Sequence, residues 1–287
     1  MDLKKPQPPA QYDDPTIGLI DLKTDYLLVN GDINESLLKL IRETIGKRLL
    51  VVENLKSTNL ILVLTTYGGD ADSAFRIGRF FQNNYASFHC FVPSYCKSAG
   101  TLIAVASDHL HIGSAGELGP LDVQVRPIDD PIGHRSGLTT NWALKDLQGH
   151  ALELFQALAY GVANDSEGIV SFPTASDLAA RMTSELMRGI YNKIDPERLG
   201  QDARNLQIAR EYGIRLNNHS KNLKQEGLNK LVNGYPSHEF VIDQTEAKEI
   251  FVRVAEPTTE MWNAIDSSLE DAMNVRSADS IVKYLTD

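Results

Sequence analysis

The chain has little of several features that would place it in a specialised class of protein. It holds two cysteines, Cys90 and Cys96, which cannot form a disulfide framework and have no metal-site spacing around them. Its longest apolar runs, such as residues 60–64, are far too short to span a bilayer. Its basic residues are scattered rather than striped. We therefore expect no nucleic-acid partner and no disulfide-rich or membrane-spanning fold.

What the chain does have is an ordinary globular composition. Hydrophobic residues make up 42% of it and charged residues 23%, which allows a large buried core at a length of 287 residues. Acidic residues outnumber basic ones and give a net charge of −10, which favours solubility. The first fifteen residues lack the apolar stretch of a secretion signal, and the few cysteines fit a reducing compartment. We expect a cytoplasmic protein.

Apolar patterns predict strands that alternate with helices in the first half of the chain. Strands are expected at residues 26–29, 59–64, 88–93 and 109–112, and helices at residues 35–49, 72–83 and 98–107. Strand–helix units in succession indicate an α/β fold with a mainly parallel sheet. Long helices follow at residues 139–163, 174–192 and 196–217, and a last strand and helix at residues 240–242 and 244–249.

These elements suggest three regions. Residues 1–16 are rich in Pro, Gln and Asp, so we expect a flexible N-terminal arm. Residues 17–255 are expected to form one catalytic domain, mainly helical over residues 139–217, and residues 256–287 a C-terminal helical tail.

Two glycine-containing loops follow neighbouring strands of the predicted sheet, at residues 67–70 and 95–100. Parallel strands end at one edge of a sheet, so both loops should lie there. Ser98 would stand at the first turn of a helix, where unpaired N–H groups suit an oxyanion, and Gly69 can bring its own N–H close to a carbonyl. A serine at such a junction is more often an N-cap, and a glycine pair more often a turn. Spacing alone leaves both interpretations open.

Longer stretches of the sequence add a resemblance. They cover residues 66–70 (Thr-Tyr-Gly-Gly-Asp), 92–104, 118–124, 235–243 and 246–249, in that order along the chain. These stretches resemble the serine dehydrogenase proteinase family of the Clp-protease/crotonase superfamily, which is related to signal peptide peptidase A. The resemblance implies a ClpP/crotonase-like spiral of strand–strand–helix units with a helical extension. It also implies a serine nucleophile that needs no metal and no organic cofactor.

The resemblance also implies roles for single residues. The nucleophile is Ser98, the oxyanion-hole amides are those of Gly69 and Ala99, and the substrate-binding positions are Gly68, Leu118 and Gly119. Relatives bind the substrate backbone as an added strand near Gly119, which suits a peptide. Lys97 is expected to contact solvent or substrate.

A serine hydroxyl needs a general base, and here the sequence departs from Clp-type proteases. Residues 119–122 hold no histidine where those enzymes have one. Lys145 resembles the lysine that signal-peptide-peptidase-like relatives use further along the chain. Such a lysine must be neutral to act, which requires burial or a nearby positive charge. A solvated lysine on an amphipathic helix is an equally good interpretation, and His134 and His150 are the alternative bases.

The sequence thus predicts a serine endopeptidase with a Ser98–Lys145 dyad that acts on a peptide or protein substrate. The resemblance also implies a homo-oligomer, for which the helices between residues 139 and 217 would be the contact surfaces. A membrane or ATPase partner stays open. Two other functions also stay open. One is a crotonase-type acyl-CoA enzyme, which uses the same pair of amides. The other is a catalytically silent ClpP-like scaffold or interaction module, which an unreactive Ser98 and an exposed, unperturbed Lys145 would favour.

Overall fold

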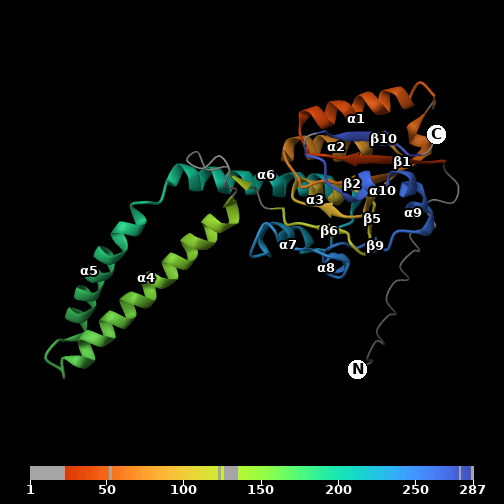
Figure 1. The fold of residues 1–287 in the computed structure, drawn as a ribbon. Coiled ribbons are helices and arrows are strands. Elements are labelled where there is room, and N and C mark those ends of the chain that lie inside the picture. Colours follow the sequence, from red (N-terminus) through yellow and green to blue (C-terminus); the bar gives the residue numbers. More distant parts are fainter. Residues whose placement is uncertain (1–22, 52–53, 122–123, 126–134, 278, 286–287) are drawn as a thin grey trace, which may run out of the picture. The chain divides into compact units, whose positions relative to one another are not determined.

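The computed structural model describes residues 23–51, 54–121, 124–125, 135–277 and 279–285 (Figure 1). The chain divides into two compact units. The first unit comprises Met1–Leu121, Arg210–Leu231 and Glu239–Asp287, and the second comprises Asp122–Ala209 and Val232–His238. The expected arm over residues 1–16 lies outside the described residues.

A six-stranded sheet forms the centre of the first unit, in the order β10-β1-β2-β3-β5-β9 (Figure 1). Of these strands, β10 pairs antiparallel with β1, and the other neighbours are parallel. Every residue of β2 is buried, which is typical of a parallel strand covered on both faces. The strands are β1 (Lys23–Asn30), β2 (Thr58–Thr65), β3 (Ser87–Val92), β5 (His109–Ile112), β9 (Val254–Ala255) and β10 (Ile281–Tyr284).

Helices cover both faces of this sheet. On one face, Phe81 of α2 packs on Phe88 of β3 with ring centroids 5.2 Å apart. On the other face, residues of α9 and α10 join a core with the sheet, formed by Leu28, Ile61, Val63, Phe91, Met261, Ile265 and Ala272. The helices are α1 (Glu35–Arg48), α2 (Ala71–Asn84), α3 (Ala99–Val105), α6 (Pro196–Ser220), α7 (Gly227–Asn233), α8 (Gln244–Ile250), α9 (Thr259–Ile265) and α10 (Leu269–Met273), with 3-10 turns at Leu55–Ser57 and Asp266–Ser268.

A second, smaller layer of extended segments follows the long strands. Ile33, which follows β1, bridges Gly69, which follows β2. Thr66 bridges Cys96 of β4 (Tyr95–Cys96), and β4 pairs in parallel with β6 (Glu117–Leu118). Helices α1, α2 and α3 come after the first three of these segments. This repeated order confirms the predicted α/β spiral of strand–strand–helix units.

The last part of the chain differs from the expected helical tail over residues 256–287. It holds α9 and α10, but β10 then returns to the sheet beside β1. The Tyr284 hydroxyl lies 2.8 Å from that of Tyr85, and the Arg48 guanidinium lies 5.2 Å from the Tyr284 ring centroid. A strand of four residues has too few positions for a periodic signal, so its partner decides its conformation.

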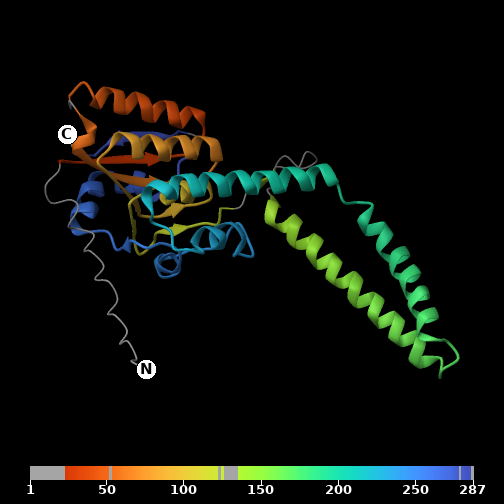
Figure 2. The ribbon, with the colours of Figure 1, turned by 180° about the vertical axis from the view of Figure 1, so that it is seen from behind.

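The second unit is mainly helical. Helices α4 (Gly137–Asp165) and α5 (Phe172–Tyr191) run antiparallel beside each other (Figures 1 and 2), and α6 begins in this unit. Short strands β7 (Gln124–Val125) and β8 (Arg135–Ser136) pair antiparallel before α4. Over the described part of the chain, no helix is long and apolar enough to cross a membrane.

Candidate active site

Ser98 stands between β4 and α3 in a backbone conformation that serine rarely adopts. Its φ is 49° and its ψ is −114°. Such conformations cost about 1–3 kcal/mol and cluster at active sites. Ser98 holds the N-cap position of α3, yet within the described chain its side chain makes no capping hydrogen bond. The ordinary role of a serine at this position is therefore not the role of Ser98.

The loop after β2 is held in place at both ends. Gly68 and Gly69 have φ values of 112° and 142°, which only glycine adopts readily. The Gly68 N–H donates a hydrogen bond to the Thr66 hydroxyl at 2.9 Å. Asp70 caps α2 by accepting a hydrogen bond from the Ser73 N–H at 2.8 Å. The loop is thus a fixed element and not a loose turn.

Two glycines pack directly against Ser98. A Cβ placed on Gly68 would lie 2.8 Å from the Ser98 Cβ and 3.3 Å from the Ala99 nitrogen. A Cβ placed on Gly119 would lie 3.3 Å from the Ser98 nitrogen. The fold therefore brings Gly68, Ala99 and Gly119 to Ser98, with Gly69 next along the loop.

Two backbone N–H groups here are available to a ligand. The residues on either side of Gly69 make the hydrogen bonds to Ile33. The Ile33 N–H donates to the Gly68 carbonyl at 2.8 Å, and the Asp70 N–H donates to the Ile33 carbonyl at 2.7 Å. Among the described residues, no backbone hydrogen bond uses the N–H of Gly69 itself. The Ala99 N–H is the first of α3 and has no acceptor within the helix. Paired amides of this kind are what an oxyanion hole requires.

Lys97 makes an ion pair that the sequence did not reveal. Its Nζ lies 2.9 Å from Glu117 Oε1, with the two side chains 10% and 19% exposed, and it donates to the Leu118 carbonyl at 3.2 Å. The expectation that Lys97 contacts solvent or substrate is wrong in this conformation, because its ammonium group is buried against β6. The pair links the loop before Ser98 to β6. No periodic pattern relates two residues so far apart in the chain.

The backbone at Leu118 and Gly119 is already paired with other parts of the chain. Leu118 and Ile242 exchange hydrogen bonds of 2.9 and 3.1 Å, while β4 lies on the other side of β6. The Gly119 N–H donates to the Thr101 hydroxyl at 3.2 Å, and that hydroxyl donates to the Gly119 carbonyl at 2.8 Å. The expected addition of a substrate strand at Leu118 and Gly119 therefore has no free edge in this conformation, because Ile242 occupies it.

Two of the three candidate bases, Lys145 and His150, belong to the second unit. Lys145 is on α4 of the second unit with an exposed side chain. His150, also exposed on α4, has ring nitrogens 3.4 Å from Asp146 and 3.5 Å from Glu153. His134 lies outside the described residues. Ser98 and Lys145 belong to different units, and their pairing stays a prediction.

Cys96 adjoins the site but has the wrong environment for a nucleophile. It is fully buried, and burial raises the pKa of its thiol well above the ordinary value. Only the thiolate reacts readily, so this raised pKa keeps Cys96 inert. Within the described ranges, no group of three or more His, Cys, Asp or Glu side chains is placed to hold a metal ion.

Comparisons with known proteins give remote likenesses. No family model matches the chain. An uncharacterized protein of Methanocaldococcus jannaschii is 26% identical over 161 residues, which cover 53% of this chain and 52% of that protein. The chain thus spans about half the length of this relative.

Three solved structures are similar to part of this chain at low TM-scores. A mutant of the 1510-N membrane-bound stomatin-specific protease gives a TM-score of 0.34 and 16% identity over 54% of this chain and 68% of its own. Another mutant of that protease, in complex with a substrate peptide, gives a TM-score of 0.34 and 20% identity. The match covers 47% of this chain and 61% of that one. ClpP1 from Listeria monocytogenes gives a TM-score of 0.24 and 14% identity. The match covers 57% of this chain and 83% of that one. The α/β fold follows from the order of strands and helices in the chain.

Proposed function

We propose that the chain is a serine peptidase that hydrolyses peptide bonds through an acyl-enzyme formed on Ser98. The observation that carries this proposal is the strained Ser98, at φ 49° and without a capping bond, beside the free amides of Gly69 and Ala99. A nucleophile on a strained strand-to-helix turn, with two amide donors in the adjoining backbone, suits acyl transfer. The resemblance of residues 66–70 and 92–104 to serine dehydrogenase proteinases supports the same chemistry.

The reaction proceeds in two halves. The Ser98 hydroxyl gives its proton to the Lys145 amine while its oxygen attacks the peptide carbonyl carbon. The carbonyl oxygen takes the negative charge and accepts hydrogen bonds from the N–H groups of Gly69 and Ala99. The C–N bond then breaks, and the leaving amine takes the proton from Lys145. A water molecule hydrolyses the acyl-enzyme by the same steps, and no metal or organic cofactor takes part.

This mechanism requires Lys145 to be neutral. A lysine acts as a base only when it is neutral, and desolvation is the usual means. Its side chain is exposed in the chain as described, although Leu144 and Leu147 beside it are half-buried. The proposal therefore requires that Lys145 lose water when it meets Ser98, through substrate, the first unit or a second copy of the chain.

The proposed substrate is a peptide that binds in extended form along Gly68 and along Leu118 and Gly119. Strand addition satisfies the peptide backbone without reading every side chain. Since Ile242 occupies the edge at Leu118, the incoming peptide must displace the Ile242 bridge. The peptide would replace the two hydrogen bonds between Leu118 and Ile242 with two of its own. The displacement therefore costs less free energy than leaving the edge at Leu118 unpaired.

Labelling with a fluorophosphonate probe tests the proposal on the purified full chain. We expect wild type to be labelled, and Ser98→Ala and Lys145→Ala to lose labelling. Ser171→Ala is the matched control, because Ser171 is also an N-cap serine but has ordinary dihedral angles (φ −67°, ψ 150°) and accepts a bond from the Thr174 N–H. It should label like wild type.

The other outcomes separate the rival functions. Labelling lost in Ser98→Ala but kept in Lys145→Ala would retain the hydrolase and transfer the base role to His134 or His150. A folded wild type that takes no label would contradict the peptidase. Tight binding of an acyl-CoA would then indicate the crotonase-type enzyme, and its absence the silent scaffold.

A further inference from the structure

Lys97, the residue before the proposed nucleophile, is held by other segments through its backbone and its side chain. Its N–H donates to the Thr66 carbonyl at 3.0 Å, and its carbonyl accepts a hydrogen bond from the Gly100 N–H at 2.8 Å. Its Nζ lies 2.9 Å from Glu117 Oε1 and donates to the Leu118 carbonyl at 3.2 Å. The peptide that leads into the nucleophile is therefore fixed on both sides.

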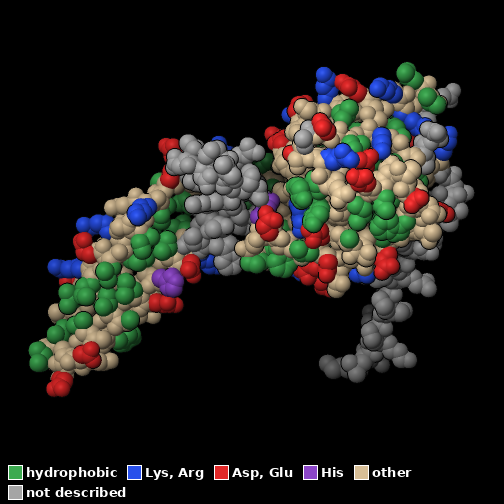
Figure 3. All heavy atoms as spheres, viewed as in Figure 1, with side chains coloured by type: hydrophobic (Ala, Val, Ile, Leu, Met, Phe, Trp, Pro, Cys, Tyr) green, Lys and Arg blue, Asp and Glu red, His purple; other side chains and the backbone are tan. Residues whose placement is uncertain are grey.

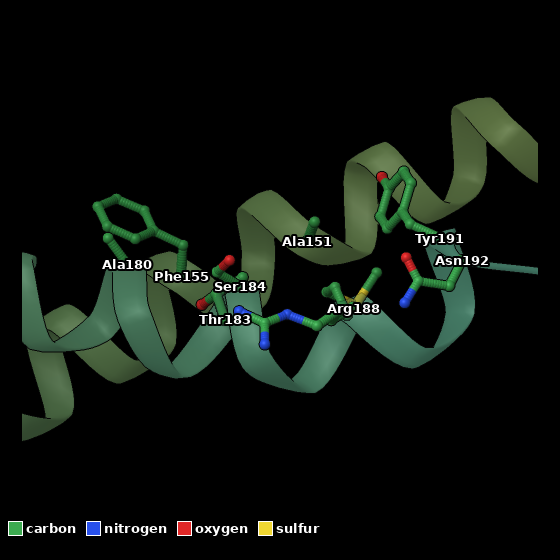
Figure 4. Close-up of a pocket in the computed structure, with 9 residues that line it drawn as sticks. Ala151, Phe155, Ala180, Thr183, Ser184, Arg188, Tyr191 and Asn192 are labelled. Carbon is green, nitrogen blue, oxygen red and sulfur yellow. The ribbon is translucent and has the colours of Figure 1, made fainter.

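The ion pair of Lys97 with Glu117 differs from the ion pairs of the surface. Charged side chains are scattered over the visible face of the molecule (Figure 3). A typical surface pair is Arg188 with Glu185, 2.6 Å apart and 60% and 65% exposed, beside the groove of about 500 Å³ between α4 and α5 (Figure 4). Exposed pairs contribute little to stability, because water screens them. Lys97 and Glu117 are only 10% and 19% exposed, so neither charge is stable there without the other.

The aliphatic part of Lys97 packs where Ser98 meets the end of β6. A Cβ placed on Gly119 would lie 2.9 Å from the Lys97 Cδ and 3.3 Å from the Ser98 nitrogen. Glu117 and Leu118 form β6, which ends directly before Gly119. Lys97 thus joins the loop of the nucleophile to the backbone along which the substrate is proposed to bind.

The Leu118 carbonyl shows what this link means for a substrate. A carbonyl oxygen has two lone pairs and can accept two hydrogen bonds. This one accepts a bond from the Ile242 N–H at 3.1 Å and a second from the Lys97 ammonium group at 3.2 Å. A peptide that displaces Ile242 therefore meets a carbonyl that Lys97 still orients.

The strained backbone of Ser98 needs support from its surroundings. A residue at φ 49° stays there only when neighbouring contacts fix it. In the part of the chain that the structure describes, no side-chain cap at Ser98 supplies that support. Its neighbours are the fixed Lys97 and the buried Ala99. We propose that Lys97 is a positioning residue, which holds Ser98 in its reactive conformation through the ion pair with Glu117. This inference rests on the proposed reaction at Ser98.

The kinetics of fluorophosphonate labelling test this role. Lys97→Met/Glu117→Met keeps the aliphatic side chains and leaves no buried charge unpaired, so the variant should fold. We expect its maximal labelling rate to fall by at least about tenfold, because a displaced nucleophile reacts slowly. The probe concentration that gives half of the maximal rate should stay within about threefold of wild type. Lys97→Arg keeps a charged donor for Glu117 and should label within about threefold of wild type.

The buried pair of Arg48 with Asp25 provides the matched control. Its atoms lie 2.6 Å apart, and the two side chains are 13% and 0% exposed. Asp25 lies near the amino end of β1, whereas Ser98 packs on the loop that follows the carboxyl end of β2. Arg48→Met/Asp25→Leu removes this distant pair in the same way and should label within about threefold of wild type. Far-UV circular dichroism checks that each variant is folded.

A stability measurement tests the same inference without any reaction. Ser98→Gly should be more stable to urea than Ser98→Ala in the parent chain, and this difference should disappear in the Lys97→Met/Glu117→Met background. A wild type that takes no label would contradict the peptidase, and the urea comparison would still decide whether the pair fixes Ser98.

Three outcomes would overturn the positioning role. The first is a labelled wild type whose rate is unchanged in Lys97→Met/Glu117→Met. The second is an equal loss of rate in the Arg48→Met/Asp25→Leu control. The third is a difference between Ser98→Gly and Ser98→Ala that is absent from the parent chain or persists without the ion pair.

Discussion

At Ser98 the needs of chemistry and of stability are opposed. Glycine adopts the backbone of Ser98 (φ 49°, ψ −114°) with less strain than alanine does. We therefore expect Ser98→Gly to be more stable to urea than Ser98→Ala by about 1 kcal/mol, after the entropic cost of glycine. Both variants should be unreactive toward the fluorophosphonate probe. Equal unfolding free energies would show that the backbone at Ser98 is unstrained.

At Gly68 the lack of a side chain matters. An added Cβ would press on the Ser98 Cβ at 2.8 Å and would hold a φ of 112°. We expect Gly68→Ala to reduce the labelling rate of Ser98 by at least about tenfold and to cost about 1–3 kcal/mol of unfolding free energy.

The control for Gly68 is Gly46, an exposed glycine of α1 whose added Cβ would meet nothing within 4 Å. Gly46→Ala should leave labelling unchanged and stabilise the chain by about 0.5–1 kcal/mol. If both variants label like wild type, the close packing of Gly68 on Ser98 does not shape the site.

At the scale of elements, strands β3 and β5 hold three histidines against one another. The rings of His89 and His109 are stacked 4.6 Å apart, and His89 Nδ1 lies 3.2 Å from His111 Nε2. Burial is the main cause that lowers the pKa of His89 to about 3 and the pKa of His109 and of His111 to about 4. The charge of Arg253 adds to this effect for His89 and His109. All three imidazoles are therefore neutral in the folded chain near pH 7.

These lowered pKa values predict a loss of stability in acid. Unfolded histidines titrate near pH 6.5, so between about pH 6.5 and 4 the unfolded chain binds more protons than the folded one. The stabilisation is complete above pH 6.5 and falls as the pH is lowered. Asp108 opposes this trend, because burial raises the pKa of its carboxyl. Urea titrations should show a loss on the order of 2 kcal/mol from pH 7 to pH 4.5, arising mainly from His89 and His111.

Two variants assign the acid sensitivity to its source. His89→Leu should lose less stability than wild type over the same pH range, because it removes one buried imidazole. His150→Ala removes an exposed histidine of α4 and should keep the wild-type slope. Parallel curves for wild type and His89→Leu would exclude the stacked histidines as the cause.

The elements that the sequence predicted are those with a local signal. Helices α1 and α2 were expected within one or two residues of their ends, because Asn34 and Asp70 cap amphipathic runs. The two-residue strands β4 and β6 and the Ile242 bridge have no period of their own, and partners distant in the sequence create them. At the site, the glycine loops and Ser98 could be identified, but the strained φ and the Lys97–Glu117 pair arise from packing.

For the whole molecule, the return of β10 to the sheet determines whether β1 is an open edge. Removing residues 279–287 would expose the hydrogen-bonding groups of β1 and leave the buried Tyr85 hydroxyl without Tyr284. We expect this truncated chain to lose several kcal/mol of stability and to aggregate with rising concentration, as open edges do. Light scattering and urea unfolding measure the two effects.

Tyr284→Phe separates the strand from its hydroxyl. It keeps β10 and loses the bond to Tyr85, so it should cost only about 1 kcal/mol and remain monodisperse. A truncated chain as stable and as soluble as Tyr284→Phe would show that β10 is dispensable to the sheet.

The two buried cysteines can report how fast different parts of the molecule open. Cys90 lies in β3 at the centre of the sheet, and Cys96 lies in β4 two residues before Ser98. Neither thiol can meet an alkylating reagent until its strand opens, so the rate of modification reports the opening of that strand. Cys96 should be modified first, at the rate at which the Ser98 loop separates from β6. Cys90 should follow at the rate of global unfolding. A single alkylation time course therefore compares the rate of local opening at the Ser98 loop with the rate of global unfolding.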